Sequence, residues 1–399
     1  MKILLLLEAT LGGTGRHILD LSSGLLELNH EVHLVYSLVR ADQAFIHGLA
    51  DLKKREPHFQ IKEIAIRREL GLSDIPAYLE LAKYAREHQP FDVLHAHSTK
   101  AGFLLRLLVS SHGASAVYTP HGLMTLNSDL QGFSRGAVCV LESCLARVTD
   151  AVIAVSGAER RCAIDTGIPA HKLTVIHNGL SATHAPALDQ RETMRARLGL
   201  GPDTVCIACI GLLVANKEPG RLLEAFAVLV RKTSQPVCLL VIGWGPLDSE
   251  LRSKAEALGI SNSVRFLGQV SGIEHLPAID ILAHTSRYEG FGYVFLEALS
   301  AGIPIVTTRV GGAEELIEPG VTGYICDPWN EDTFASYLQL FIEDPQRRDA
   351  AAPAARAKAE QSSATVMVEA TAALYDSLRK HATASVRAPK DRVISRTPQ

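Results

Sequence analysis

The chain has 399 residues, 47% hydrophobic and 21% charged, the composition of a soluble globular protein long enough for two domains. Its formal charge of −3 and pI near 6.6 give no excess of Lys and Arg for neutralising phosphates, which excludes nucleic acid as an expected partner. No window approaches the roughly 18 uninterrupted apolar residues of a membrane span, so we expect at most peripheral membrane contact.

The first residues, MKILLLLE, predict a buried strand and not a signal peptide, because the apolar run ends at Glu8 and no small-residue cleavage site follows. We therefore expect a cytoplasmic protein, with the inner face of the cytoplasmic membrane as an alternative location. The seven cysteines are scattered. Cys206 and Cys209 form a CxxC pair, but in a strand-like run residues three apart face opposite sides, which favours reduced, buried thiols over a metal or redox pair.

Short runs rich in Val and Ile alternate with longer amphipathic stretches along the whole chain. In the first half, strands are predicted at 2–7, 31–37, 91–97, 116–121, 151–156 and 172–179, with helices such as 16–29 and 102–111. In the second half, strands are predicted at 205–211, 237–243, 264–268, 281–286, 304–310 and 322–328, with helices such as 221–232 and 247–259. This alternation predicts an α/β protein with two Rossmann-like, doubly wound domains that face each other across a ligand cleft.

Changes in composition suggest the boundaries between these parts. The polar, weakly periodic stretch at 183–203 separates a domain at 1–182 from a domain at 204–360. A helix at 361–380 is expected to return to the first domain. The basic stretch at 381–399 predicts a disordered tail, with attraction to an anionic membrane surface as the alternative.

A glycine-rich stretch, EATLGGTGRH, follows the first predicted strand. Gly12, Gly13 and Gly15 let the backbone approach a ligand closely, and the helix that begins behind them favours an anion. It is not a dinucleotide fingerprint, because the third glycine of GxGxxG is absent and the strand at 31–37 does not end in an acid. A simple tight turn would explain the stretch equally well.

Polar side chains follow two later strands of the first half. His95 and His97 lie on one face of the strand at 91–97, but no neighbouring Cys or acid completes a ligand set, so no metal site is predicted. We expect a polar lining at this strand end instead, with Ser98 and Lys100 facing a substrate in the cleft. His121 ends the next strand, where a role in the cleft and a structural role are both open.

The second half carries the more informative pattern. Lys217, near a helix start, could supply a positive charge for a phosphate. In YEGFGYVFLEALSAGIP, a helix is predicted to begin at Glu289, where Gly290 and Gly292 leave the backbone open and helix N–H groups can hold phosphate oxygens. Glu297, two turns later, can accept two hydroxyls such as those of a ribose. The alternative is an ordinary helix N-terminus with surface acids.

At this point the chain resembles the retaining glycosyltransferases of family 4, of the bacterial polysaccharide-biosynthesis type, which have the two-domain GT-B fold and use nucleotide-sugar donors. The matching stretches occur in family order up to about residue 327: GGTGRH, AVIAVSGAER, VIHNG, GWGP, VRFLG, YEGFGYVFLEALSAGIPIV and GGAEELIEPGVTGYICDP. The resemblance implies an acceptor domain at 1–182 and a nucleotide-sugar donor domain at 204–360.

The resemblance also implies residue roles. Glu289 would contact hydroxyls of the donor sugar, Glu297 would hold the ribose, and Lys217 would bind the diphosphate. Gly13 would approach the phosphates from the other domain, and His121 would lie beside the transferred sugar. The predicted catalytic residues are Glu289, Lys217 and His121; the donor-binding residues are Gly13, Gly290, Phe291, Gly292 and Glu297; the acceptor-side residues are His97, Ser98 and Lys100.

One position departs from the family pattern. Many relatives have Arg where this chain has Leu212, and that arginine works with the lysine on the diphosphate. Losing a bidentate cation removes stabilisation from the leaving group, and a lysine does not replace it geometrically. Arg221 and Arg287 are candidates for compensation.

The implied reaction is transfer of a hexose from a UDP- or GDP-sugar to an acceptor hydroxyl with retention, with no obligatory metal or other cofactor. By analogy with the family, the acceptor is expected to be a lipid-linked sugar or a growing cell-surface polysaccharide. Two alternatives stay open: a nucleotide-sugar 2-epimerase of the same architecture, and a catalytically degenerate nucleotide-sugar-binding protein, which Leu212 would favour.

Overall fold

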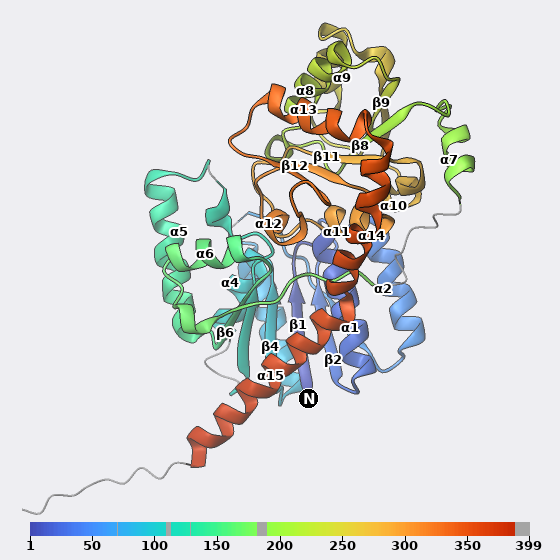
Figure 1. Ribbon diagram of the computed structural model, residues 1–399. Helices are drawn as coiled ribbons and strands as arrows, with labels where there is room; N and C mark the ends of the chain where they lie inside the picture. The colour runs from blue at the N-terminus through green and yellow to red at the C-terminus, as the bar shows by residue number, and fades with distance from the viewer. Residues whose placement is uncertain (70, 109–112, 128, 182–189, 388–399) are drawn as a thin grey trace, which may run out of the picture.

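The computed structural model describes residues 1–69, 71–108, 113–127, 129–181 and 190–387. Two sheets lie in separate halves of the molecule (Figure 1). The first has 7 strands in the order β3-β2-β1-β4-β5-β6-β7, and the second has 6 strands in the order β10-β9-β8-β11-β12-β13. Within the described residues, all neighbouring strands of both sheets pair in parallel. The predicted fold class, two doubly wound α/β domains, is confirmed.

The first domain alternates strands and helices in chain order. Its strands are β1 (Lys2–Leu7), β2 (Glu31–Tyr36), β3 (Gln60–Glu63), β4 (Val93–His97), β5 (Ser115–Thr119), β6 (Ala151–Ala154) and β7 (Leu173–Val175). Its helices are α1 (Gly13–Glu27), α2 (Gln43–Arg55), α3 (Asp74–His88), α4 (Thr99–Leu108), α5 (Gly132–Leu145) and α6 (Gly157–Asp165), with 3₁₀ turns η2 (Met124–Leu126), η3 (Ala146–Val148) and η4 (Ala170–Lys172).

The second domain repeats this arrangement. Its strands are β8 (Val205–Ile210), β9 (Val237–Ile242), β10 (Val264–Gly268), β11 (Ile281–His284), β12 (Ile305–Thr308) and β13 (Gly323–Cys326). Its helices are α7 (Arg191–Arg197), α8 (Pro219–Lys232), α9 (Asp248–Ala257), α10 (Gly272–His275), α11 (Tyr293–Ala301), α12 (Ala313–Leu316), α13 (Glu331–Ile342) and α14 (Pro345–Gln361), with 3₁₀ turns η7 (Ala215–Lys217), η8 (Ser261–Ser263) and η9 (Leu276–Ala278).

Each sheet is buried on both faces, which is why its strands read as continuous apolar runs. Strand β1 illustrates the packing: Leu4 and Leu6 join the apolar cluster on one face, while Ile3, Leu5 and Leu7 join the cluster on the other. Helices cover both faces of each sheet. The polar groups that follow the strands therefore lie at the carboxyl ends of the strands, where they can contact a ligand.

The predicted strands all correspond to observed ones, and one observed strand was not predicted. Strand β3 has the sequence QIKE and pairs with β2 at the edge of the first sheet. Its side chains are exposed or half-buried, so its sequence lacks the apolar pattern on which strand prediction depends. Among the helices of the described residues, none combines the length and the apolar composition needed to cross a membrane.

The chain returns to the first domain at its C-terminal end. Helix α15 (Ala364–Arg387) packs against α1, and its residues Met367, Val368 and Tyr375 join the apolar cluster on one face of the first sheet (Figure 1). The helix runs to Arg387, past the predicted end at residue 380. Residues 388–399 of the predicted tail and 182–189 around the predicted linker lie outside the described residues. The described part of that linker contains α7, which packs against η9 in the second domain.

Candidate active site

The strand order reverses between β1 and β4 in the first sheet and between β8 and β11 in the second. In doubly wound sheets such reversal points are where ligands bind, beside the carboxyl ends of the strands. The segments that follow these four strands carry nearly all the residues singled out in the sequence. The two domains therefore present their candidate residues at matching places.

The segments from the two domains touch. A Cβ added to Gly290 would lie 2.9 Å from the carbonyl carbon of His121, and one added to Gly13 would lie 2.7 Å from the ring of Tyr293. Neither position has room for a side chain, and in both cases the neighbour belongs to the opposite domain. The segments that carry Gly13 and His121 in the first domain thus meet the segment that carries Gly290 and Tyr293 in the second.

Glu289 is held by three side chains of the second domain. Lys217 forms an ion pair with its Oε1, Ser286 Oγ donates to the same oxygen at 3.0 Å, and His284 Nε2 lies 3.0 Å from it. His284 ends β11, while Lys217 comes from the segment after β8. The predicted lysine and glutamate are therefore in direct contact, and His284, which was not predicted, is a further partner of the glutamate.

Charge dominates the protonation of this group. Burial by itself would raise the pKa of Glu289, but the Lys217 ammonium and the hydrogen bond with His284 outweigh it and hold the pKa well below its usual range. Burial lowers the pKa of His284, against the opposing effect of Glu289. The site therefore contains an ionised carboxylate beside an ammonium, ready to accept hydroxyl donors and to attract phosphate.

Glu297 lies about one turn into α11 and forms an ion pair with Arg16 of the first domain. Arg16 is the last residue but one of the EATLGGTGRH stretch, and its guanidinium lies 5.5 Å from the centre of the Tyr293 ring. Burial raises the pKa of Glu297, and Arg16 opposes this. Burial also raises the pKa of Asp20, one turn after Arg16 on α1, to about 6.

The turn that carries His121 is fixed by a buried carboxylate. Glu159 Oε1 accepts from the backbone N–H groups of Gly122 at 2.6 Å and Leu123 at 2.9 Å, and its Oε2 accepts from Val155 at 2.8 Å. His121 has a φ of 56°, in the left-handed region that is uncommon for residues other than glycine. Such strain is retained where the surroundings enforce it, which is frequent at functional sites.

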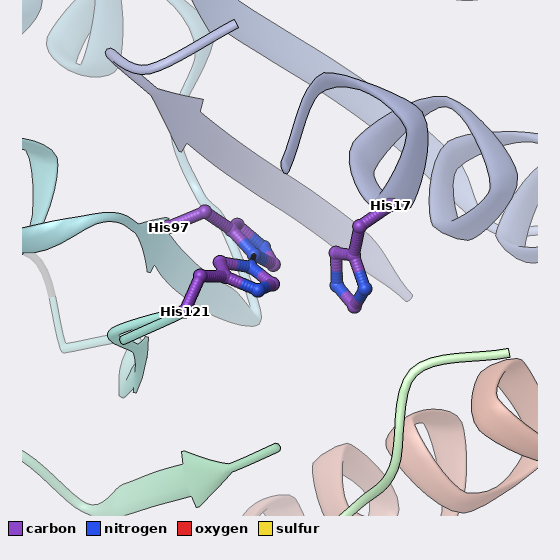
Figure 2. A group of neighbouring side chains, drawn as sticks. All are labelled: His17, His97 and His121. Carbon is purple, nitrogen blue, oxygen red and sulfur yellow. Dashed lines mark hydrogen bonds between the residues drawn. The ribbon is translucent and has the colours of Figure 1, made fainter. Parts of the chain in front are cut away.

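The ring of His121 contacts two other histidines of the first domain. Its Nε2 lies 3.0 Å from Nδ1 of His97, and His17 of α1 packs edge-on against its ring at 4.4 Å between centroids. Figure 2 shows the three imidazoles directed toward one another. Burial lowers the pKa of each of them, that of His17 to about 4, so all three are neutral at neutral pH. The sequence argument against a metal used only near neighbours in the chain, and so it did not include His17 and His121.

Two predicted acceptor-side residues are less open than expected. Lys100 is buried and donates to Asp74 Oδ2 at 2.6 Å and to the carbonyl of Glu69 at 2.7 Å, so its ammonium is committed within the first domain. Ser98 is buried, directly follows β4 and has a φ of 77°. Its hydroxyl makes no hydrogen bond to the described residues.

The predicted start of the helix at Glu289 is wrong. Helix α11 begins at Tyr293, because Gly292 adopts a φ of 87° as its N-cap and Glu289 to Gly292 form a turn before it. Phe291 is buried in this turn and stacks on His177 at 5.2 Å between centroids. Its side chain anchors the turn, which leaves its backbone as the part that could meet a ligand.

Leu212 leaves the site with fewer cations than the family pattern has. Arg221 is paired with Glu218 at 2.6 Å and Arg287 with Asp129 at 2.9 Å, so both suggested substitutes are engaged. Arg16 pairs with Glu297 across the two domains, and its Nε and Nη2 atoms are buried without a hydrogen bond to the described residues.

Sequence reasoning missed Arg16, His17 and His284. All three lie inside stretches already singled out, EATLGGTGRH and ILAHTS, and His284 lies in the strand predicted at 281–286, which ends at His284 in the structure. The rule that strand ends line the cleft would have found His284. No local signal shows that Arg16 reaches Glu297, because that contact joins residues far apart in the chain.

Comparisons with known proteins agree with this architecture. Residues 11–184 match the family described as Glycosyltransferase Family 4, and residues 190–358 match the family described as Glycosyl transferases group 1. The D-inositol 3-phosphate glycosyltransferase of Corynebacterium urealyticum is 32% identical over 285 residues, which are 66% of this chain and 66% of that protein.

A further relative and a solved structure extend the comparison. The GDP-mannose-dependent alpha-(1-6)-phosphatidylinositol monomannoside mannosyltransferase of Mycolicibacterium smegmatis is 34% identical over 183 residues, 43% of this chain and 47% of that protein. Anabaena HepE in complex with UDP-glucose superposes with a TM-score of 0.79 at 26% identity, covering 94% of this chain and 100% of that one. The two family matches together span both domains, so the chain belongs to the family 4 glycosyltransferases and has their two-domain GT-B fold.

Proposed function

We propose that this glycosyltransferase moves a hexose from a UDP- or GDP-sugar to an acceptor hydroxyl with retention of the anomeric configuration. The observation that carries the proposal is the Lys217–Glu289–His284 group at the reversal point of the second sheet. An ammonium beside an ionised carboxylate suits a donor that has a diphosphate next to sugar hydroxyls. Support for the donor class comes from HepE, whose structure contains UDP-glucose, and from the GDP-mannose-dependent relative.

Each predicted residue has a task in this proposal. Lys217 stabilises the negative charge that develops on the departing diphosphate, and Glu289 positions the sugar through its hydroxyls. Glu297 accepts the ribose hydroxyls, and the backbone of Gly13 and of Gly290 to Gly292 lies against the donor. His121 lies beside the transferred sugar, where its fixed turn holds the ring in place.

We assign the acceptor side to the first domain. His97 and Ser98 lie at the end of β4, and Lys100 lies in the first turn of α4. We propose a lipid-linked sugar or a growing cell-surface polysaccharide as the acceptor, on the cytoplasmic side of the membrane. The reaction proposed requires no metal or other cofactor, because Lys217 and backbone donors stabilise the leaving group. Closure of the two domains excludes water, which would otherwise hydrolyse the donor.

Arg16 is a further cation that the first domain brings to the donor side of the site. It approaches the donor side from the first domain and already contacts Glu297. In the proposal it shares its positive charge between Glu297 and the donor when the domains are closed, because its Nε and Nη2 atoms make no hydrogen bond to the described residues.

The test is donor binding measured as a thermal shift with a panel of UDP-, GDP- and ADP-sugars. We expect one UDP- or GDP-sugar to stabilise the wild type, Lys217→Ala to abolish the shift and Leu212→Arg to retain or enlarge it. Lys232→Ala is the matched control, because Lys232 pairs with Asp332 at 2.8 Å on the surface of the same domain. No shift with any donor, or an equal shift in Lys217→Ala, would contradict the proposed donor site.

A further inference from the structure

Three imidazoles from different elements of the first domain form one buried cluster. His17 comes from α1, His97 from the end of β4 and His121 from the turn after β5 (Figure 2). One ring nitrogen of each lies within 4.8 Å of the others. We propose that His17, His97 and His121 bind one divalent transition-metal ion of the zinc class.

The hydrogen bonding of the rings leaves ligand atoms available. Nδ1 of His17 and Nε2 of His97 are buried and make no hydrogen bond to the described residues. A buried polar atom without a partner costs about 1–3 kcal/mol, so ordinary packing does not account for them. His95, the fourth histidine in this region, is excluded as a ligand because Tyr375 and Thr119 occupy its two nitrogens.

The distances are compatible with closure around an ion. Nitrogen ligands lie about 2.1 Å from zinc, so in a tetrahedral site they are about 3.4 Å from one another. Nδ1 of His97 is hydrogen-bonded to Nε2 of His121 at 3.0 Å, which leaves Nε2 of His97 as its available nitrogen. One nitrogen from each ring lies within 4.8 Å of the nitrogens of the other two, so no separation exceeds that of a tetrahedral site by more than about 1.4 Å. Shifts of this size are within the reach of side-chain rotations.

The chemistry of the cluster selects the kind of ion. Metal ions bind unprotonated ring nitrogens of histidine, and the cluster offers one nitrogen from each of three rings. Three nitrogen ligands without a carboxylate favour Zn²⁺, Co²⁺ or Ni²⁺ over Mg²⁺ and Ca²⁺, which prefer oxygen. The set of three histidines also leaves a fourth ligand position for water or another oxygen donor.

The position of the cluster connects it to the donor. The backbone of His121 packs closely against Gly290, and the proposed function puts the His121 ring beside the transferred sugar, so an ion on that ring would lie beside the sugar. An ion that takes a nitrogen of His121 removes that ring from the sugar, and we therefore expect metal and donor to compete. This consequence rests on the proposed function, whereas metal binding by the three histidines does not.

The test is a titration of the metal-free full-length protein with Co²⁺, followed by visible absorption. We expect one Co²⁺ per chain with the strong ligand-field bands of a tetrahedral nitrogen site. The spectrum distinguishes the cluster from the free cysteines, since a thiolate ligand adds a sulfur-to-cobalt charge-transfer band in the near ultraviolet. Addition of Zn²⁺ should displace the Co²⁺, and Mg²⁺ should not.

Substitutions of single histidines identify the residues that bind the ion. His17→Gln and His97→Gln should each lose the tetrahedral bands, while His171→Gln, at an exposed histidine of the same domain, should keep them. Circular dichroism checks that each variant is folded. If His17→Gln does not fold, His17→Asn takes its place. Absence of the bands in the folded wild type, a thiolate band, or wild-type binding by folded His17→Gln and His97→Gln would each overturn the proposal.

A second titration in the presence of the stabilising nucleotide sugar separates the two claims. A weaker apparent affinity for Co²⁺ is the expected result. Unchanged Co²⁺ affinity at saturating donor would leave the metal site intact and would contradict the placement of His121 beside the transferred sugar.

Discussion

Replacement of Lys217 by alanine leaves the Glu289 carboxylate without its cation. The side chain of Lys217 is 26% exposed and that of Glu289 is 14% exposed, so the pair lies between a surface pair and a buried one. Breaking a buried pair costs about 3–5 kcal/mol, and an exposed pair contributes about 0–1 kcal/mol. Because Ser286 and His284 still contact Glu289, we expect Lys217→Ala to lower the free energy of unfolding of the second domain by about 2 kcal/mol.

Urea unfolding followed by tryptophan fluorescence measures this effect selectively. Both tryptophans of the chain, Trp244 and Trp329, follow strands of the second sheet, so the signal reports that domain. Lys217→Ala/Glu289→Gln should recover about half or more of the loss, because the unpaired charge is gone. Lys232→Ala, which breaks an exposed pair, should change stability by less than about 0.5 kcal/mol.

The stabilisation of the second domain by Lys217 changes with pH in a defined direction. Because the pKa of Glu289 is lower in the folded protein than its ordinary value of 4.5, the stabilisation by Lys217 is complete above that value and declines as the pH falls below it. The difference between wild type and Lys217→Ala should therefore be constant from pH 6 to 8 and shrink below about pH 4.5. Equal stability of the two proteins at pH 7, or a difference that grows on acidification, would refute the reasoning.

Two further predictions concern the opposite domain and the contact between the domains. Gly290→Ala places a Cβ 2.9 Å from the carbonyl carbon of His121, so two backbone segments must separate. We expect this substitution to weaken donor binding by at least about tenfold in a calorimetric titration. Gly136→Ala is the control and should have no effect, because a Cβ at Gly136 would meet no atom within 4 Å. Burial raises the pKa of Asp20 from 3.8 to about 6, so the free-energy cost of burying its carboxylate grows between about pH 4 and pH 6 and is constant above that. Asp20→Asn should therefore stabilise the first domain by about 2 kcal/mol at pH 7 and by almost nothing at pH 4 in urea unfolding followed by circular dichroism. Gly290→Ala with wild-type affinity, or Asp20→Asn with no stabilisation at pH 7, would contradict these two expectations.

The sheets could be predicted because their strands are buried on both faces. Runs such as VCLLVI are apolar throughout, and the sequence shows them directly. Strand β3 could not be found in this way, since QIKE lies at a sheet edge with polar side chains. The start of α11 was placed four residues too early because nothing in the local pattern says that Gly292 caps the helix in a left-handed conformation.

The candidate site was predictable where it depends on strand ends and less so where it depends on contacts. Lys217 and Glu289 were named from their positions, and the structure brings them into one ion pair. The pairing of Arg16 with Glu297 joins two domains, and the contact of His17 with His97 joins a helix to a distant strand. Local sequence patterns do not contain such contacts, which is why Lys100 was expected in the cleft although Asp74 binds it.

The central claim, retaining transfer that depends on Glu289, is tested most directly by following the anomeric signals with NMR during turnover. The protein is incubated with the α-linked nucleotide sugar that stabilises it and with a lipid extract as the source of acceptor. We predict that the donor signal is replaced by the signal of an α-linked product, and that Glu289→Ala slows this at least about 100-fold while keeping its fold. A β-linked product, or wild-type turnover by Glu289→Ala, would contradict the account.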